Sequence, residues 1–241
     1  MDHNWHDKVA NIEHWLRPIF RRHSRLGGPA FFDPQSFPAS KALSGGYSVI
    51  RAEFERARVR MQDFPLFQDI SPEQKSISND DKWKMFFLKS NNIRFDRNCE
   101  QFPETMKIVD SDKNIVSAYF SILESNKMLT PHEGPWSGVL RMHLGVDIPT
   151  DGKGCTLSVM GEEYQWQDGE VVVFDDTYTH FAINLTDRPR VVLFMDYMRP
   201  LPWPLHALNK FFIFIGRFLP YYKVPLARHR EWEKRFYGEA G

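Results

Sequence analysis

Three of the nine histidines, His132, His143 and His180, lie where short apolar runs alternate with turns, and imidazole is a common metal ligand. His132 lies at a turn that enters a predicted strand, and His180 lies just after a second turn. Two histidines on neighbouring strands of a barrel could converge inside it. Imidazole suits iron in sites that keep open positions for oxygen chemistry. The pair alone also fits two structural histidines.

A third residue, Arg190, favours the iron interpretation. It begins the predicted strand that follows His180. A dicarboxylate that chelates iron through its 2-oxo acid end needs its far carboxylate held, and a guanidinium can hold it through two parallel hydrogen bonds. Ser121, on an earlier predicted strand, could donate another hydrogen bond there. These residues predict an Fe(II) site that uses 2-oxoglutarate and O2 as co-substrates.

The carboxylate ligand that accompanies two histidines in most enzymes of this chemistry is missing. It would stand two residues after the first histidine, where this chain has Gly134. Glu133 points the wrong way if the segment is extended, and the turn position of Asp175 and Asp176 favours backbone capping. The residues predict a two-histidine site whose third position is taken by water or by a carboxylate from elsewhere.

Short runs rich in β-branched and aromatic residues must supply the strands that carry these side chains. They are residues 83–89, 116–123, 138–143, 155–159, 170–174 and 190–197. Many short strands joined by turns are typical of a sandwich or a jelly-roll barrel rather than of a parallel sheet. We therefore predict a mainly β fold with flanking helices.

Apolar residues at helical spacing predict an amphipathic helix over residues 5–26, which Pro18 is expected to kink or split, and a second helix over residues 47–61. The pattern divides the chain into three regions. We expect a helical N-terminal support region over 1–80, the barrel over 81–200, and an amphipathic, basic C-terminal tail over 201–241.

These residues resemble the aspartyl/asparaginyl β-hydroxylase family of Fe(II)- and 2-oxoglutarate-dependent dioxygenases, including its bacterial lipid-hydroxylase-like branch. The matching pieces cover roughly residues 80–200 and are 83–88, Ser121, 131–135, 140–145, 161–162, Trp166, 174–176, His180 and 190–193. The family is known for lacking the carboxylate ligand, so Gly134 fits its pattern. The resemblance implies a cupin-like double-stranded β-helix.

The resemblance also implies roles for the residues that match. It makes His132 and His180 the iron ligands of the catalytic centre, and it makes Ser121 and Arg190 the residues that hold the far carboxylate of 2-oxoglutarate.

Three further positions of the match are implied to lie around the co-substrate. Arg141 and His143 line its near end or meet the substrate, and Trp83 packs beside it. Peptide-acting members carry a basic residue where Val139 stands here. That departure argues against an acidic peptide substrate.

The C-terminal region bears on the substrate. Residues 205–219 form a predicted helix with a broad apolar face, and basic residues flank or follow it: Lys210, Arg217, Lys223, Arg228, Arg230, Lys234 and Arg235. Such a helix can lie in an anionic membrane interface, or it can pack on the barrel. A lipid acyl chain is therefore the predicted substrate. The alternatives are a peptide or free amino-acid β-hydroxylase, and a barrel-fold binding protein that has lost catalysis.

Composition excludes other classes. Lys+Arg and Asp+Glu both number 31, so the chain lacks the basic excess typical of nucleic-acid binding. Its two cysteines, Cys99 and Cys155, argue against a disulfide scaffold or a cysteine zinc site. No run approaches the ~20 apolar residues of a membrane span, and the N-terminus lacks an apolar signal core. We expect a cytoplasmic protein that is peripheral at the inner membrane surface if its tail binds lipid.

Overall fold

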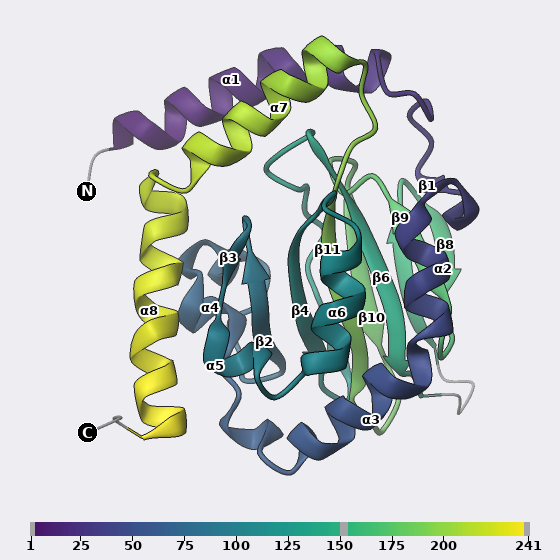
Figure 1. Ribbon diagram of the computed structural model, residues 1–241, viewed down its shortest axis with the longest axis vertical. Coiled ribbons are helices and arrows are strands. Elements are labelled where there is room, and N and C mark those ends of the chain that lie inside the picture. The colour runs from purple at the N-terminus through teal and green to yellow at the C-terminus, as the bar shows by residue number, and fades with distance from the viewer. Residues whose placement is uncertain (1–2, 150–153, 239–241) are drawn as a thin grey trace.

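Two antiparallel β-sheets form the centre of the molecule in a computed structural model that describes residues 3–149 and 154–238 (Figure 1). The larger sheet has the order β1-β9-β6-β11-β4-β2-β3, and the smaller sheet has the order β5-β10-β7-β8. The larger sheet consists of β1 (Phe31–Phe32), β2 (Trp83–Ser90), β3 (Ile93–Arg94), β4 (Ile115–Leu123), β6 (Val139–Asp147), β9 (Val171–Phe174) and β11 (Arg190–Met198). The smaller sheet consists of β5 (Lys127–Met128), β7 (Cys155–Val159), β8 (Glu162–Gln165) and β10 (His180–Asn184). The predicted class, mainly β with flanking helices on a jelly-roll core, is confirmed.

Strand register places the predicted site residues of the larger sheet on one face. Ser121 in β4 pairs with Val192 in β11, and His143 in β6 pairs with Phe194 in β11. Val192 and Phe194 have the same parity along β11 as Arg190, and residues that alternate along a strand share a face. Ser121, His143 and Arg190 therefore point to the same side of the sheet.

Helices cover the other face of the larger sheet. They are α2 (Pro38–Gly45), α3 (Tyr47–Arg58) and α6 (Pro103–Ser111), which contact one another and strands β4, β6 and β9 (Figure 1). The sequence predicted the second of these over residues 47–61, but α3 ends at Arg58, and a separate 3-10 helix, η2 (Met61–Asp63), follows it. It did not predict α2, α6 or the short α5 (Asp96–Cys99), because each is too short to show a clear helical period.

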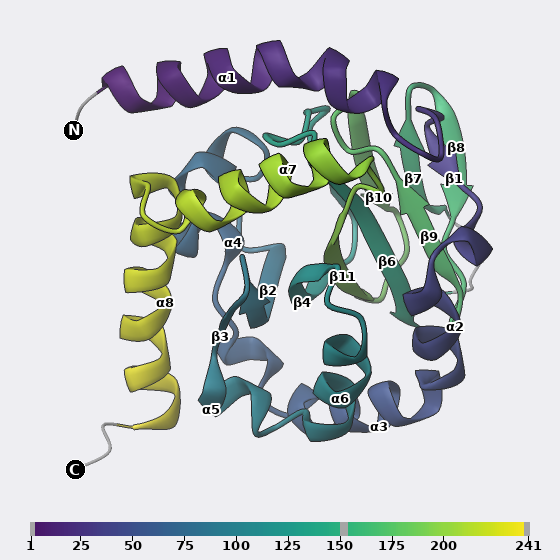
Figure 2. The same cartoon turned by 45° about the horizontal axis from the view of Figure 1, so that its top comes forward.

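Three longer helices frame one end and one side of the barrel. Helix α1 (His3–Arg22) runs on through Pro18, so the predicted split does not occur. Helix α7 (Trp203–Gly216) lies beside α1 across the end of the barrel, and α8 (Pro220–Tyr237) stands against the β2 side (Figures 1 and 2). No helix in the described part of the chain is both long enough and apolar enough to cross a bilayer.

Candidate active site

The structure brings His132 and His180 next to each other. Their backbones form an antiparallel bridge, with His132 N donating to His180 O at 3.0 Å and His180 N donating to His132 O at 2.9 Å. The two ring centroids are 4.2 Å apart. His180 begins β10, and His132 lies in the segment between β5 and β6. The histidines thus converge from two separate turns, as their spacing predicted.

Backbone carbonyls orient both imidazoles. Nδ1 of His132 lies 2.7 Å from Thr130 O, and Nδ1 of His180 lies 2.9 Å from Tyr178 O. A carbonyl only accepts, so each Nδ1 carries the proton and each Nε2 keeps its lone pair. Burial lowers the pKa of His132 to about 4 and also lowers the pKa of His180. Two neutral imidazoles with free Nε2 atoms are the form that binds a metal ion.

The side chain of Asp176 occupies the space beside Gly134, where the missing carboxylate ligand would have its side chain. A Cβ at Gly134 would lie 2.1 Å from Oδ2 of Asp176, so the site has no room for a side chain there. Glu133 points away and accepts a hydrogen bond from Arg17 Nη1 at 2.7 Å. Within the described residues, no group of three or more His, Cys, Asp or Glu side chains is placed to hold a metal. The donor set that fits iron here is the histidine pair.

The two aspartates before His180 differ in what they do. Asp175 caps its turn as predicted, since its Oδ1 accepts from Thr177 N at 3.1 Å. For Asp176 the capping prediction is wrong. Its Oδ2 forms an ion pair with Arg141, and its Oδ1 is buried without a hydrogen-bond partner in the described chain. The guanidinium of Arg141 therefore takes the place at Oδ2 that the sequence assigned to a backbone amide.

Arg190 is a buried cation with unused donors. It is 2% exposed, and its Nε and Nη1 find no hydrogen-bond partner among the described residues. Its guanidinium carbon lies 4.7 Å from the centroid of the Trp166 ring, and burial lowers the pKa of Arg190 to about 10. An unpaired buried charge is costly, so the arrangement fits a carboxylate ligand.

Ser121 lies on the same face of the larger sheet as Arg190, and Trp83 contacts Ser121. Trp83 Nε1 donates to Ser121 Oγ at 3.1 Å, which leaves the serine O–H free to donate elsewhere. Trp83, Ser121 and Arg190 all line one cavity.

Arg141 and His143 lie between Arg190 and the histidine pair. Arg141 forms ion pairs with Asp176 and Asp196, and its guanidinium carbon lies 4.1 Å from the Phe194 ring centroid. Both ring nitrogens of His143 are buried without hydrogen-bond partners in the part of the chain described. Burial, with Arg190 nearby, lowers the pKa of His143 well below its ordinary value, so this imidazole is neutral.

All seven predicted site residues line one cavity of about 200 Å³. They are Trp83, Ser121, His132, Arg141, His143, His180 and Arg190. Sequence reasoning missed another part of the cavity lining, which Ile213 of α7 and Tyr222 of α8 contribute together with Val139 and Val116. The only signal in the sequence was the apolar residue at Val139.

The protein-family comparison identifies the family to which the chain belongs. The family model described as aspartyl/asparaginyl beta-hydroxylase matches residues 45–200, which is more than half of the chain. The chain belongs to this family. It is therefore a hydroxylase, and the alternative of a binding protein without catalysis is dropped.

Individual relatives agree with the family. An ornithine lipid ester-linked acyl 2-hydroxylase from Rhizobium tropici is 38% identical over 230 residues, which cover 95% of this chain and 82% of that protein. The human aspartate beta-hydroxylase domain-containing protein 2 is 32% identical over 172 residues, or 66% of this chain and 44% of that protein. A solved prolyl-4-hydroxylase structure from Pseudomonas putida aligns with a TM-score of 0.42 and 13% identity, covering 64% of this chain and 87% of that chain.

Proposed function

We propose that this hydroxylase binds Fe(II) through His132 and His180, uses 2-oxoglutarate and O2, and hydroxylates an unactivated C–H bond on a lipid acyl chain. One observation carries the proposal. Two imidazoles that are oriented through Nδ1, and a buried arginine whose Nε and Nη1 have no hydrogen-bond partner among the described residues, line the same cavity. The first suits a metal, and the second suits the far carboxylate of a dicarboxylate.

The residues of the cavity then have distinct tasks. Bound Fe(II) would activate O2, and 2-oxoglutarate would supply the two electrons that allow one oxygen atom of O2 to enter the C–H bond. Arg190 and Ser121 hold the far carboxylate, and Trp83 keeps Ser121 oriented through its 3.1 Å hydrogen bond. His143, neutral and buried, lines the cavity without adding charge.

A lipid substrate is supported by an apolar part of the cavity lining. Val116, Val139 and Ile213 form an apolar cluster that lines the cavity. Arg141, the cation that could attract an acidic peptide, is already paired with two carboxylates. The similarity to a protein named as an ornithine lipid acyl hydroxylase points the same way.

The outer surface suits a membrane interface. Phe211, Phe214 and Phe218 of α7 and its C-terminal flank are more than half exposed, and α7 contains no acidic residue. An apolar groove of about 380 Å³ lies between α1 and α7, and α7 also carries the exposed Lys210. Contiguous exposed apolar surface with cations marks a lipid-binding face. On this basis we propose that the protein works at the cytoplasmic membrane surface.

The test is mass spectrometry of lipid and peptide fractions from cells with and without the protein. We expect lipids to gain one oxygen atom with the wild type and not with His132→Ala or His180→Ala. A gain confined to peptides or amino acids would replace the lipid proposal by the β-hydroxylase alternative. Full activity in either histidine variant would contradict the iron site.

A further inference from the structure

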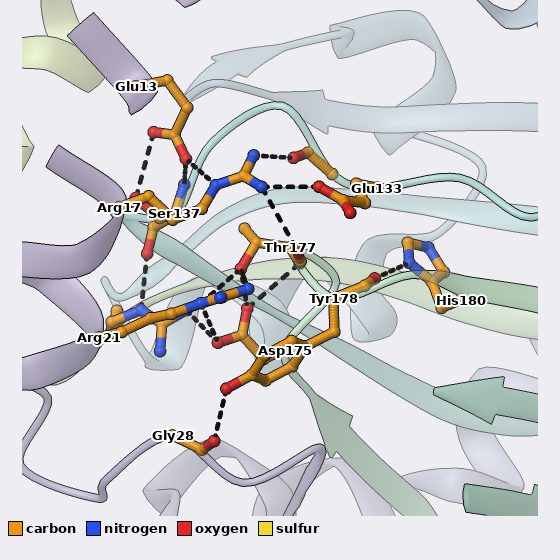
Figure 3. A network of polar contacts seen from close by, with 12 residues as sticks. Glu13, Arg17, Arg21, Gly28, Glu133, Ser137, Asp175, Thr177, Tyr178 and His180 are labelled. Atoms are coloured by element: carbon orange, nitrogen blue, oxygen red, sulfur yellow. Dashed lines mark hydrogen bonds and ion pairs between the residues drawn. The ribbon is translucent and has the colours of Figure 1, made fainter. Parts of the chain in front are cut away.

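Helix α1 lies outside the matched residues 45–200 and yet contacts both turns that carry the histidines (Figure 3). The guanidinium of Arg17 reaches from α1 to each turn. Nη1 donates to Glu133 Oε2 at 2.7 Å and Nη2 to Gly134 O at 3.3 Å, both in the turn after His132. Nη1 also donates to Thr177 O at 3.4 Å, in the turn before His180.

Arg17 is itself fixed at its base. Its Nε donates to Glu13 Oε1 at 3.1 Å, and Glu13 is 4% exposed. Glu13 in turn accepts from Ser137 N at 2.9 Å and from Ser137 Oγ at 3.1 Å. The helix is therefore bound to the first turn at two points, through Glu13 at one and through Arg17 at the other.

Arg21, one turn further along α1, secures the second turn. Its Nη2 donates to Thr177 Oγ1 at 2.7 Å, and its guanidinium carbon lies 3.9 Å from the centroid of the Tyr178 ring. Tyr178 supplies the carbonyl that accepts from Nδ1 of His180 at 2.9 Å. Tyr178, whose carbonyl orients the imidazole of His180, is thus covered by Arg21 of α1.

We propose that Arg17 is a positioning residue for the metal site, because it joins the turn after His132 to the turn before His180. The inference rests on the proposed function, since it takes the histidine pair as the metal ligands. Arg17 touches neither ligand. It acts through Glu133, Gly134 and Thr177, and it requires the planar fork of a guanidinium, which a lysine lacks. Partners that orient metal ligands typically change metal affinity by 10–100-fold when they are removed.

Binding of Co(II) to the purified full chain, followed by absorbance without substrate or turnover, tests the proposal. We expect Arg17→Ala to weaken the affinity by about tenfold and Arg17→Lys to weaken it less. Arg22→Ala, an exposed arginine on the same helix, serves as the matched control and should bind as the wild type does. Removing a positive charge near a cation site would by itself tighten binding. A weaker affinity therefore reports lost geometry and not lost charge.

Thermal melts by circular dichroism accompany each titration. If Arg17→Ala does not fold, Arg17→Lys decides, because it keeps both the charge and the helix. Wild-type affinity in a folded Arg17→Ala, or in Arg17→Lys when only that variant folds, would overturn the positioning role while leaving the proposed function intact. A wild-type protein that binds no Co(II) or Fe(II) would overturn the proposed function and this inference together.

Discussion

Arg190 lines the cavity that contains the histidine pair, and its Nε and Nη1 have no hydrogen-bond partner in the described part of the chain. If it holds 2-oxoglutarate, Arg190→Ala removes a charge-assisted hydrogen-bond partner that contributes roughly 1.5–3 kcal/mol. We expect the 2-oxoglutarate KM to rise by about tenfold to a hundredfold. Arg190→Lys should restore the 2-oxoglutarate KM only in part, because lysine lacks the fork geometry of a guanidinium.

Steady-state 2-oxoglutarate titrations measure this change. Arg188→Ala is the control, because Arg188 lies on the same segment with a side chain that is 60% exposed. Unchanged 2-oxoglutarate kinetics in Arg190→Ala would mean that another cation holds the carboxylate.

Gly134 stands against the carboxylate of Asp176, and this contact changes what a ligand introduced there would do. From the sequence alone, aspartate at this position would be expected to reach the metal. The structure leaves no room for its Cβ, which would lie 2.1 Å from Oδ2 of Asp176. Asp176 cannot move without breaking its ion pair with Arg141.

We therefore expect even Gly134→Ala to destabilise the fold by about 1–3 kcal/mol, as overpacking of a tight site does. Urea denaturation of Gly134→Ala and of Gly154→Ala measures the difference. Gly154 has φ +85° but open space around it, so Gly154→Ala measures the cost of backbone strain without crowding. Stability equal to that of the wild type in Gly134→Ala would show that Asp176 moves freely.

At the scale of elements, α7 has two faces with different tasks. Asn209 and Ile213 are buried, and Asn209 Nδ2 donates to Gly138 O at 2.7 Å, whereas Phe211 and Phe214 are 54% and 53% exposed. Packing on the barrel and contact with lipid are therefore compatible in this helix, although the sequence presented them as alternatives.

Phe211→Asp with Phe214→Asp should leave the fold stable and weaken binding to anionic vesicles at low salt. Ile213→Asp should destabilise the protein by roughly 3 kcal/mol or more, since it buries a charge without a partner. Vesicle flotation and thermal melts of the three proteins check both expectations. A wild-type protein that ignores vesicles at every salt concentration would contradict the membrane assignment.

Helix α8 is anchored by a buried histidine whose charge state depends on pH. His229 is 1% exposed, its ring centroid lies 4.0 Å from that of Phe95, and Glu233 Oε2 lies 3.8 Å from its Nδ1. Burial lowers the pKa of His229 to about 3. The unfolded chain takes up this proton near pH 6.5, before the folded chain does. Its contribution to stability is therefore present above pH 6.5 and is lost as the pH falls towards 3.

His229→Gln, which keeps a polar side chain, should reduce the dependence of unfolding free energy on pH below 6.5. The reduction should be about 1.4 kcal/mol per pH unit, the slope of one proton. Urea denaturation at pH 7, 6 and 5 measures it. His14→Gln, an exposed histidine, is the control. An identical slope in wild type and His229→Gln would mean that His229 is already protonated in the folded protein.

At the scale of the whole molecule, the strands were predictable because alternating β-branched and aromatic runs mark them locally. Strand β7 has the bounds that the sequence predicted, and β4 and β11 differ by one residue at an end. The convergence of His132 and His180 was predictable from the same pattern, since both lie at turns of the predicted barrel. Nothing in the comparisons tests the metal or co-substrate roles of the individual residues, and these stay predictions.

The parts that the sequence did not predict depend on distant contacts. The ion pair between Asp176 and Arg141 joins the turn after β9 to strand β6, and local pattern made Asp176 look like a turn cap. The bond from Arg17 to Glu133 spans 116 positions along the chain. The wall that α7 and α8 add to the cavity appears only once the tail folds back over the barrel.

Helix α7 carries Ile213 on the cavity side and Phe214 on the outside. An α-helix with its side chains is about 10–12 Å across. If the outer side rests among lipid headgroups, a hydrocarbon tail has about that distance to travel from the bilayer to the lining of the cavity. The tail need not pass through bulk water, so the reaction would need no soluble carrier to deliver the lipid. Turnover should then depend on how much protein is at the surface of a vesicle, and not on how much free lipid is dissolved.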